Sequence, residues 1–162
     1  MSLRIREVDY ADPRDADAVV AVLDSYASDP VGGGRGLPAD VRGRLVPSLR
    51  DHSTSLVLLA ELDGAAVGIA VCFWGLSTFR ARPLLNIHDL AVLPQYRGQG
   101  IGRALLSAAE GHARENGCCR LTLEVQDDNR PARELYRRFG FDDVLYDDTG
   151  PTRFLAKPLG SS

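Results

Sequence analysis

Residues 97–103, Arg-Gly-Gln-Gly-Ile-Gly-Arg, combine residue types that can bind a negatively charged group. Three glycines expose backbone N–H groups with almost no side chain in the way, and an arginine at each end adds positive charge. An apolar run ends just before Pro94, and apolar residues recur at helical spacing after the glycines. A strand, a glycine turn and a helix N-terminus in this order favour a phosphate or pyrophosphate ligand. The candidate ligand residues are Arg97, Gly98, Gln99, Gly100, Ile101, Gly102 and Arg103.

Glycine spacing alone does not identify the ligand that contains this phosphate. The chain contains no GxxxxGK[ST] sequence, so no lysine is placed to reach the terminal phosphates of a nucleotide. The GxGxxG spacing of a dinucleotide fold also fails, because the third glycine comes one position early. Glycines between a strand and a helix can also be ordinary turn and cap residues.

Two segments carry a resemblance to a known family. Gln95-Tyr-Arg-Gly-Gln-Gly100, after a strand that ends at Val92, resembles the [QR]xxGx[GA] acetyl-CoA motif of the GNAT N-acetyltransferases. Residues 129–141, Asn-Arg-Pro-Ala-Arg-Glu-Leu-Tyr-Arg-Arg-Phe-Gly-Phe, resemble the NxxAxxLYxxxGF signature of the same family. Two motifs in the right order are far more specific than either one alone. The resemblance covers residues 55–157 and implies acetyl-CoA as the co-substrate, with no metal.

The resemblance also implies roles for individual residues. The backbone of Leu90, Ala91 and Val92, unpaired with the next strand, would bind the pantetheine arm, and an N–H there would polarise the thioester carbonyl. Asn129 would contact the cofactor near the pantetheine, and Tyr136 would protonate the departing thiolate.

The general base for the incoming amine is left open by the sequence. His88 and Asp89 are adjacent polar residues in an otherwise apolar strand, where alternation lets only one of them face a given cleft. Alternatively, His88 has only a structural role, as a buried histidine whose ring nitrogens bond to a neighbouring group. Glu124, on a later alternating strand, is a third candidate or an outward-facing charge. Some similar GNAT members carry a carboxylate where His88 stands, so the base is His88, Asp89 or Glu124, acting directly or through water.

The acceptor is predicted to be the primary amine of a small molecule. In the resembling family the segment between the first two strands walls the acceptor site, which makes Tyr26, Arg35 and Arg42 specificity candidates, with surface or packing roles as the alternative. Two other functions stay open: acetylation of a protein or peptide amine, and a catalytically silent CoA-binding module. A cysteine nucleophile is disfavoured because no base is paired with any cysteine by spacing.

The pattern of apolar residues predicts an α/β fold in one domain, residues 1–159, followed by a tail at 160–162, and the resemblance implies that this fold is of the GNAT type. We expect a mixed, mostly antiparallel sheet of about six to seven strands flanked by about four helices. Residues 29–38, rich in glycine and proline, are expected to form a mobile connection. The expected strands are 3–8, 55–62, 65–76, 84–92, 120–126, 142–146 and 152–157, and the expected helices are 16–28, 39–50, 102–116 and 130–139.

Composition narrows the class of protein. A net charge of −3 argues against a sequence-independent nucleic-acid binder. The longest apolar run, residues 65–76, is too short to span a membrane, and the N-terminus lacks the apolar core of a signal peptide. The three cysteines have no metal-ligand spacing. We therefore expect a cytoplasmic protein without a metal, and the family resemblance adds the expectation of a homodimer.

Overall fold

The computed structural model describes residues 1–145 and 150–160. The chain separates into two compact units, Met1–Gln126 and Asp127–Ser162. The first unit holds a five-stranded sheet and the first three α-helices, and the second holds the last α-helix and the chain that follows it. The expected single domain at 1–159 with a tail at 160–162 stays a prediction.

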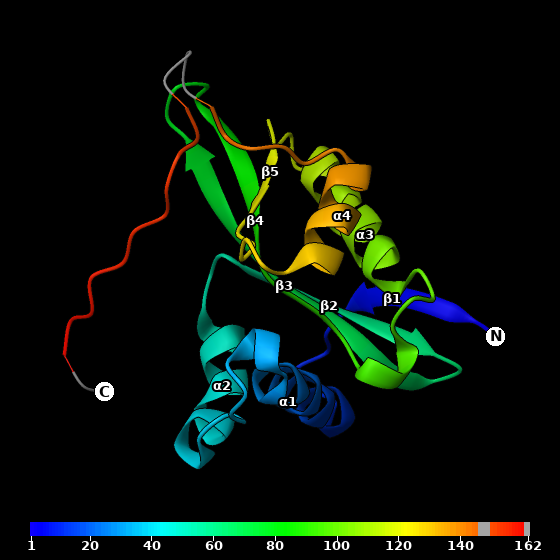
Figure 1. Cartoon of the computed structure of the whole chain (residues 1–162). Helices are drawn as coiled ribbons and strands as arrows, with labels where there is room; N and C mark the ends of the chain where they lie inside the picture. Colours follow the sequence, from blue (N-terminus) through cyan, green and yellow to red (C-terminus); the bar gives the residue numbers. More distant parts are fainter. Residues whose placement is uncertain (146–149, 161–162) are drawn as a thin grey trace. The chain divides into compact units, whose positions relative to one another are not determined.

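The sheet is mixed and mostly antiparallel, as predicted (Figure 1). Its strands lie side by side in chain order, and each pair is antiparallel except the last, where β5 runs parallel to β4. Asp63 and Gly64 both take positive φ in the β2–β3 turn, the geometry that a tight hairpin requires. The strands are β1 (Leu3–Glu7), β2 (Ser55–Leu62), β3 (Ala65–Ser77), β4 (Arg82–Val92) and β5 (Leu121–Leu123).

Four α-helices lie in the described residues, in agreement with the prediction. The first begins at Pro13 rather than at Ala16, because the Asp12 side chain caps its first turn and proline is tolerated there. Pro47 lies inside α2. The helices are α1 (Pro13–Ser28), α2 (Ala39–Asp51), α3 (Ile101–Glu115) and α4 (Arg130–Phe139), with short 3₁₀ turns η1 (Pro30–Gly32) and η2 (Pro94–Tyr96).

The described residues form five strands, fewer than the six to seven predicted. Residues 142–145 and 152–157 form no strand; this part of the described chain has one isolated bridge, between Leu145 and Pro151. Aspartates at positions 142 and 143 disfavour strand pairing. Tyr146, the last residue of the strand expected at 142–146, lies outside the described residues. The expected strand at 120–126 shortens to Leu121–Leu123, where it pairs with β4.

Alternation along the strands divides the core between two faces of the sheet. On one face, Ile69 and Val71 of β3 pack with the buried side chains of Val19 and Val22 from α1. On the other face α3 approaches closely: a Cβ added at Gly68 of β3 would lie 3.2 Å from a methyl of Ile101. The first unit is therefore a sheet with α1 and α2 on one face and α3 on the other (Figure 1).

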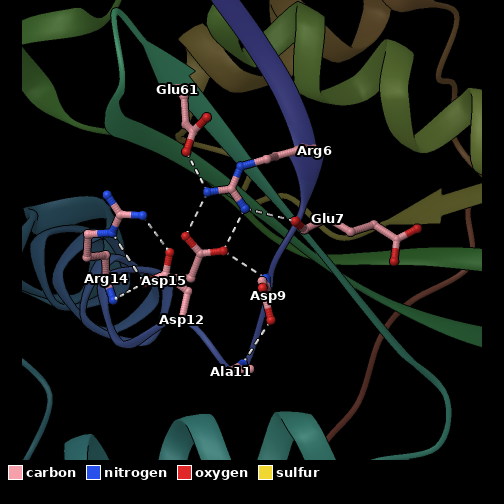
Figure 2. Close-up of polar contacts among 8 residues, drawn as sticks. All are labelled: Arg6, Glu7, Asp9, Ala11, Asp12, Arg14, Asp15 and Glu61. Atoms are coloured by element: carbon pink, nitrogen blue, oxygen red, sulfur yellow. Dashed lines mark hydrogen bonds and ion pairs between the residues drawn. The ribbon is translucent and has the colours of Figure 1, made fainter.

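A charged cluster ties β1, α1 and β2 together (Figure 2). The Arg6 guanidinium donates to both carboxylate oxygens of Asp15, at 2.6 and 2.7 Å, and also to Glu61. The Asp9 N–H donates to Asp15 as well, at 2.7 Å. The side chain of Asp15 is only 5% exposed. These hydrogen bonds, chiefly those from Arg6, lower the pKa of the Asp15 carboxyl below its ordinary value.

We expect Asp15→Asn to lower the free energy of unfolding by about 2 to 4 kcal/mol at neutral pH, since it leaves the partly buried Arg6 without its main carboxylate. Because the folded-state pKa of Asp15 is depressed, its stabilisation is complete above the ordinary aspartate pKa. That stabilisation is lost as pH falls from the ordinary value through the folded-state value. Urea unfolding at several pH values measures this. Asp17→Asn on the same helix is the control, and an acid limb as steep in Asp15→Asn as in the wild type would contradict the prediction.

No α-helix in the described part of the chain is both long and apolar enough to cross a membrane.

Candidate active site

The glycine turn combines positive-φ glycines with the N-terminus of α3. Gly98 and Gly100 take φ values of +74° and +81°, a conformation that other residues rarely adopt. Gly100 is the N-cap of α3 and has no side chain to cap the helix. The first N–H groups of an α-helix have no partner within the helix, and its dipole is positive at that end. The turn therefore presents backbone donors to an anion.

Arg97 extends from this turn toward the loop that follows α1. Its Nε–H donates to the Val92 carbonyl at 3.1 Å, and its Nη1 donates to a carboxylate oxygen of Asp29 at 3.0 Å. The turn is thus joined to a residue 68 positions earlier in the chain. Nothing in the sequence pointed to Asp29 as a partner.

The edge of β4 that faces β5 is open beyond Ile87. The two strands pair only at Leu85, Asn86 and Ile87, so no strand in the described residues covers the rest of this edge. The Leu93 N–H donates to Val67 on the β3 side. Because successive backbone groups of a strand point to opposite sides, Leu90 and Val92 direct theirs to the open edge. Ala91 lies two residues before Leu93, so its N–H and carbonyl also point toward β3.

His88 and Asp89 reach the same face of the sheet, which corrects the expectation that only one of them could. Val71 of β3 lies opposite Asp89, but the next residue, Cys72, lies opposite Ile87, so His88 is an extra residue in β4. This β-bulge breaks the alternation. Asp89 shares a face with Val71, and the His88 ring meets Phe73 edge-on at 5.5 Å on that face. The adjacent polar pair lies at the bulge but did not predict it.

Asp89 is partly buried where β4 faces the end of α1. Burial raises the pKa of its carboxyl above the ordinary value, and His88 partly opposes that shift. The pKa of Tyr26 on α1 is raised by burial and then by the nearby carboxylates of Asp89 and Asp29. Burial, with a contribution from Asp89, raises the pKa of the Cys72 thiol to about 12, so this thiol stays protonated near neutral pH.

The other residues predicted from the first unit lie in more exposed positions. Glu124 follows the end of β5 and is exposed. Arg35 is exposed in the loop between α1 and α2, and Arg42 on α2 lies 3.9 Å from Asp24. Of the three specificity candidates, Tyr26 is the one that lies close to Asp89. His88 is exposed as well, and its ring contact with Phe73 was not expected from the sequence.

Asn129 and Tyr136 belong to the second compact unit. Asn129 is the N-cap of α4, and its side-chain oxygen accepts a hydrogen bond from the Ala132 N–H at 3.3 Å. The ring of Tyr136 meets Phe141 edge-on at 5.9 Å. Gly140 ends the helix in a left-handed conformation, which aims Phe141 back along it. The second motif therefore builds a capped helix that carries Tyr136.

A hollow of about 340 Å³ lies beside the first half of α1. Its charged lining includes Arg6, Asp15 and Glu61, where one guanidinium pairs with two carboxylates. In residues 1–145 and 150–160, no three histidine, cysteine or acidic side chains gather as metal ligands would.

Comparison with known proteins identifies the family. The model of the Acetyltransferase (GNAT) family matches residues 12–141. The chain belongs to this family. It is 32% identical over 142 residues to the uncharacterized N-acetyltransferase YhfO of Bacillus subtilis, an alignment that covers 84% of this chain and 87% of YhfO. It is 35% identical over 150 residues to the streptothricin acetyltransferase of Streptomyces lavendulae, covering 90% of this chain and 68% of that enzyme.

A solved structure agrees on the fold of this GNAT acetyltransferase. The ribosomal-protein-alanine N-acetyltransferase from Brucella melitensis superposes with a TM-score of 0.75 at 21% identity, over 94% of this chain and 100% of that one. At that identity the similarity supports the fold alone. Family membership makes this GNAT protein an acetyltransferase and confirms the resemblance seen in its two motifs.

Proposed function

We propose that this acetyltransferase transfers the acetyl group of acetyl-CoA to the primary amine of a small molecule by direct attack. The observation that carries the proposal is the open edge of β4 next to the glycine turn. The turn at residues 97–103 suits a pyrophosphate, because its positive-φ glycines and helix N-terminus present donors. The backbone groups of Leu90 and Val92 suit an extended amide-containing arm.

The proposed chemistry uses groups on the chain to move two protons. Asp89, whose pKa is raised by burial, accepts a proton from the incoming ammonium group directly or through water. The free amine attacks the thioester carbonyl, a C–N bond forms, and the C–S bond breaks. A backbone N–H on the open edge of β4 stabilises the oxyanion. Tyr136 gives a proton to the departing thiolate, and Asn129 contacts the cofactor. The nitrogen then releases its second proton to solvent, and solvent returns a proton to Tyr136. His88 and Glu124 are the alternative bases.

The similarity to the streptothricin acetyltransferase supports a small-molecule acceptor, because that relative aligns with 90% of this chain. The alternatives to this proposal are a peptide acceptor and a catalytically silent CoA-binding module. The proposal also includes a homodimer in the cytoplasm, without a bound metal. Sedimentation velocity tests the homodimer.

A free-thiol release assay tests the function. We would offer acetyl-CoA with a panel of amines, polyamines, amino acids, aminoglycosides, streptothricin and peptides, and measure CoA binding in parallel by calorimetry. Thiol release that depends on one small amine supports the proposal. Preference for peptides would overturn the acceptor class. CoA binding without turnover on any acceptor would favour the silent module.

A further inference from the structure

The loop at residues 29–38, which we expected to be a mobile connection, forms hydrogen bonds with an aspartate at each end. The Asp29 carboxylate accepts from the Val31 N–H at 3.1 Å, and the Asp29 carbonyl accepts from the N–H groups of Gly32 and Gly34, both at 2.9 Å. At the other end, the Asp24 carboxylate accepts from the Leu37 N–H at 2.7 Å. Two aspartates of similar chemistry thus hold the same loop.

Only one of these aspartates also bonds to the glycine turn. Asp29 accepts from Arg97 at 3.0 Å, whereas the partner of Asp24 outside the loop is Arg42 of α2, at 3.9 Å. The Asp29 side chain is 17% exposed, so its pairing with Arg97 is partly shielded from water. The loop and the turn therefore share one ion pair.

Arg97 can bond an anion without leaving Asp29. A guanidinium has five N–H donors in a fixed plane, and the bonds to Val92 and Asp29 use one donor on Nε and one on Nη1. A phosphate oxygen at the turn would take another donor. An anion bound there would hold Arg97 in place, and Arg97 would in turn hold Asp29.

We infer that Asp29 is a positioning residue that couples the glycine turn to the loop at residues 29–38 through Arg97. CoA bound at the turn stabilises the loop, and the ordered loop strengthens CoA binding by the same factor, because coupling between two sites is reciprocal. The loop follows Tyr26, which lies near Asp89, so its order bears on the acceptor side of the site. This inference rests on the proposed function, since it takes CoA as the ligand of the turn.

Hydrogen exchange of the loop amides tests the coupling without any acceptor. In the wild type we expect CoA to slow exchange at Val31, Gly32 and Gly34. Asp29→Asn keeps an oxygen that can cap Val31 but removes the charge that pairs with Arg97. In this variant the slowing should disappear, and the Kd for CoA should rise about two- to fivefold, the range of a partly exposed ion pair.

Asp24→Asn is the matched control, because it makes the same substitution at the other end of the loop, in a residue that pairs with Arg42 rather than with Arg97. In this variant CoA should still slow exchange at Val31 and Gly34. Adding Asp29→Asn to Arg97→Gln should cause no further loss of CoA affinity. CoA binding with unchanged loop exchange in the wild type would overturn the inference alone. Failure of CoA to bind would overturn the proposed function with it.

Discussion

Tyr136→Phe is expected to lower kcat by about 10²- to 10⁴-fold, the range for loss of a general acid. The substitution removes one hydroxyl and keeps the ring, so the edge-on contact with Phe141 can persist. The Kd for CoA should change by less than about threefold, because an interaction made mainly in the transition state contributes little to ground-state binding. Stopped-flow thiol release gives kcat, and calorimetry gives the Kd.

Tyr96→Phe is the matched control, since it removes a tyrosine hydroxyl from η2, outside both the catalytic set and the candidate phosphate residues. It should leave kcat within about twofold. A Tyr136→Phe enzyme with wild-type turnover would show that another group, or water, protonates the thiolate. A loss of CoA binding equal to the loss of kcat would instead assign Tyr136 a binding role.

Asp89→Asn is expected to lower kcat/KM by about 10²- to 10³-fold, because the amide cannot accept the ammonium proton. The raised pKa of Asp89 sets the sign of the pH dependence. Wild-type activity should rise with pH through a pKa above the ordinary aspartate range, as the carboxylate ionises. That rising limb should disappear in Asp89→Asn, leaving only the limb for deprotonation of the amine itself. Initial rates across the pH range measure both.

The two alternative bases supply the controls. His88→Gln and Glu124→Gln remove the other candidates, and both positions are exposed, so neither change should unfold the protein. If Asp89 is the base, each should keep kcat/KM within about tenfold of the wild type. A larger loss in His88→Gln, with Asp89→Asn nearly normal, would move the base to the imidazole.

The pH dependence of stability gives an independent check on Asp89. Its folded-state pKa is raised, so the folded state favours the protonated form. Asp89 therefore adds stability below the unfolded-state pKa, and that stability is lost as pH rises through the folded-state value. The sign is opposite to that for Asp15, whose folded-state pKa is depressed. Comparing Asp15→Asn with Asp89→Asn by urea unfolding should therefore show opposite changes in the acid limb.

Features set by neighbouring residues could be predicted from the sequence. The Asp63-Gly64 hairpin, the glycine turn and the helix at Arg130–Phe139 each depend on backbone preferences and caps within a few residues. Both family motifs lie in such stretches, which is why the family and the cofactor class could be inferred. The described part of the strand expected at 142–146 and the strand expected at 152–157 do not form, because a strand needs a pairing partner, and an apolar pattern does not supply one.

The tertiary structure added what depends on distant partners. The bulge that turns both His88 and Asp89 to one face exists only in the register of β4 against β3, and strand alternation alone predicted the opposite. The raised pKa of Asp89 comes chiefly from burial, which exists only in the folded chain. The contact between Asp29 and Arg97 joins two loops that no sequence pattern places side by side. Register, burial and long-range ion pairs arise only when the chain has folded, so no local pattern encodes them.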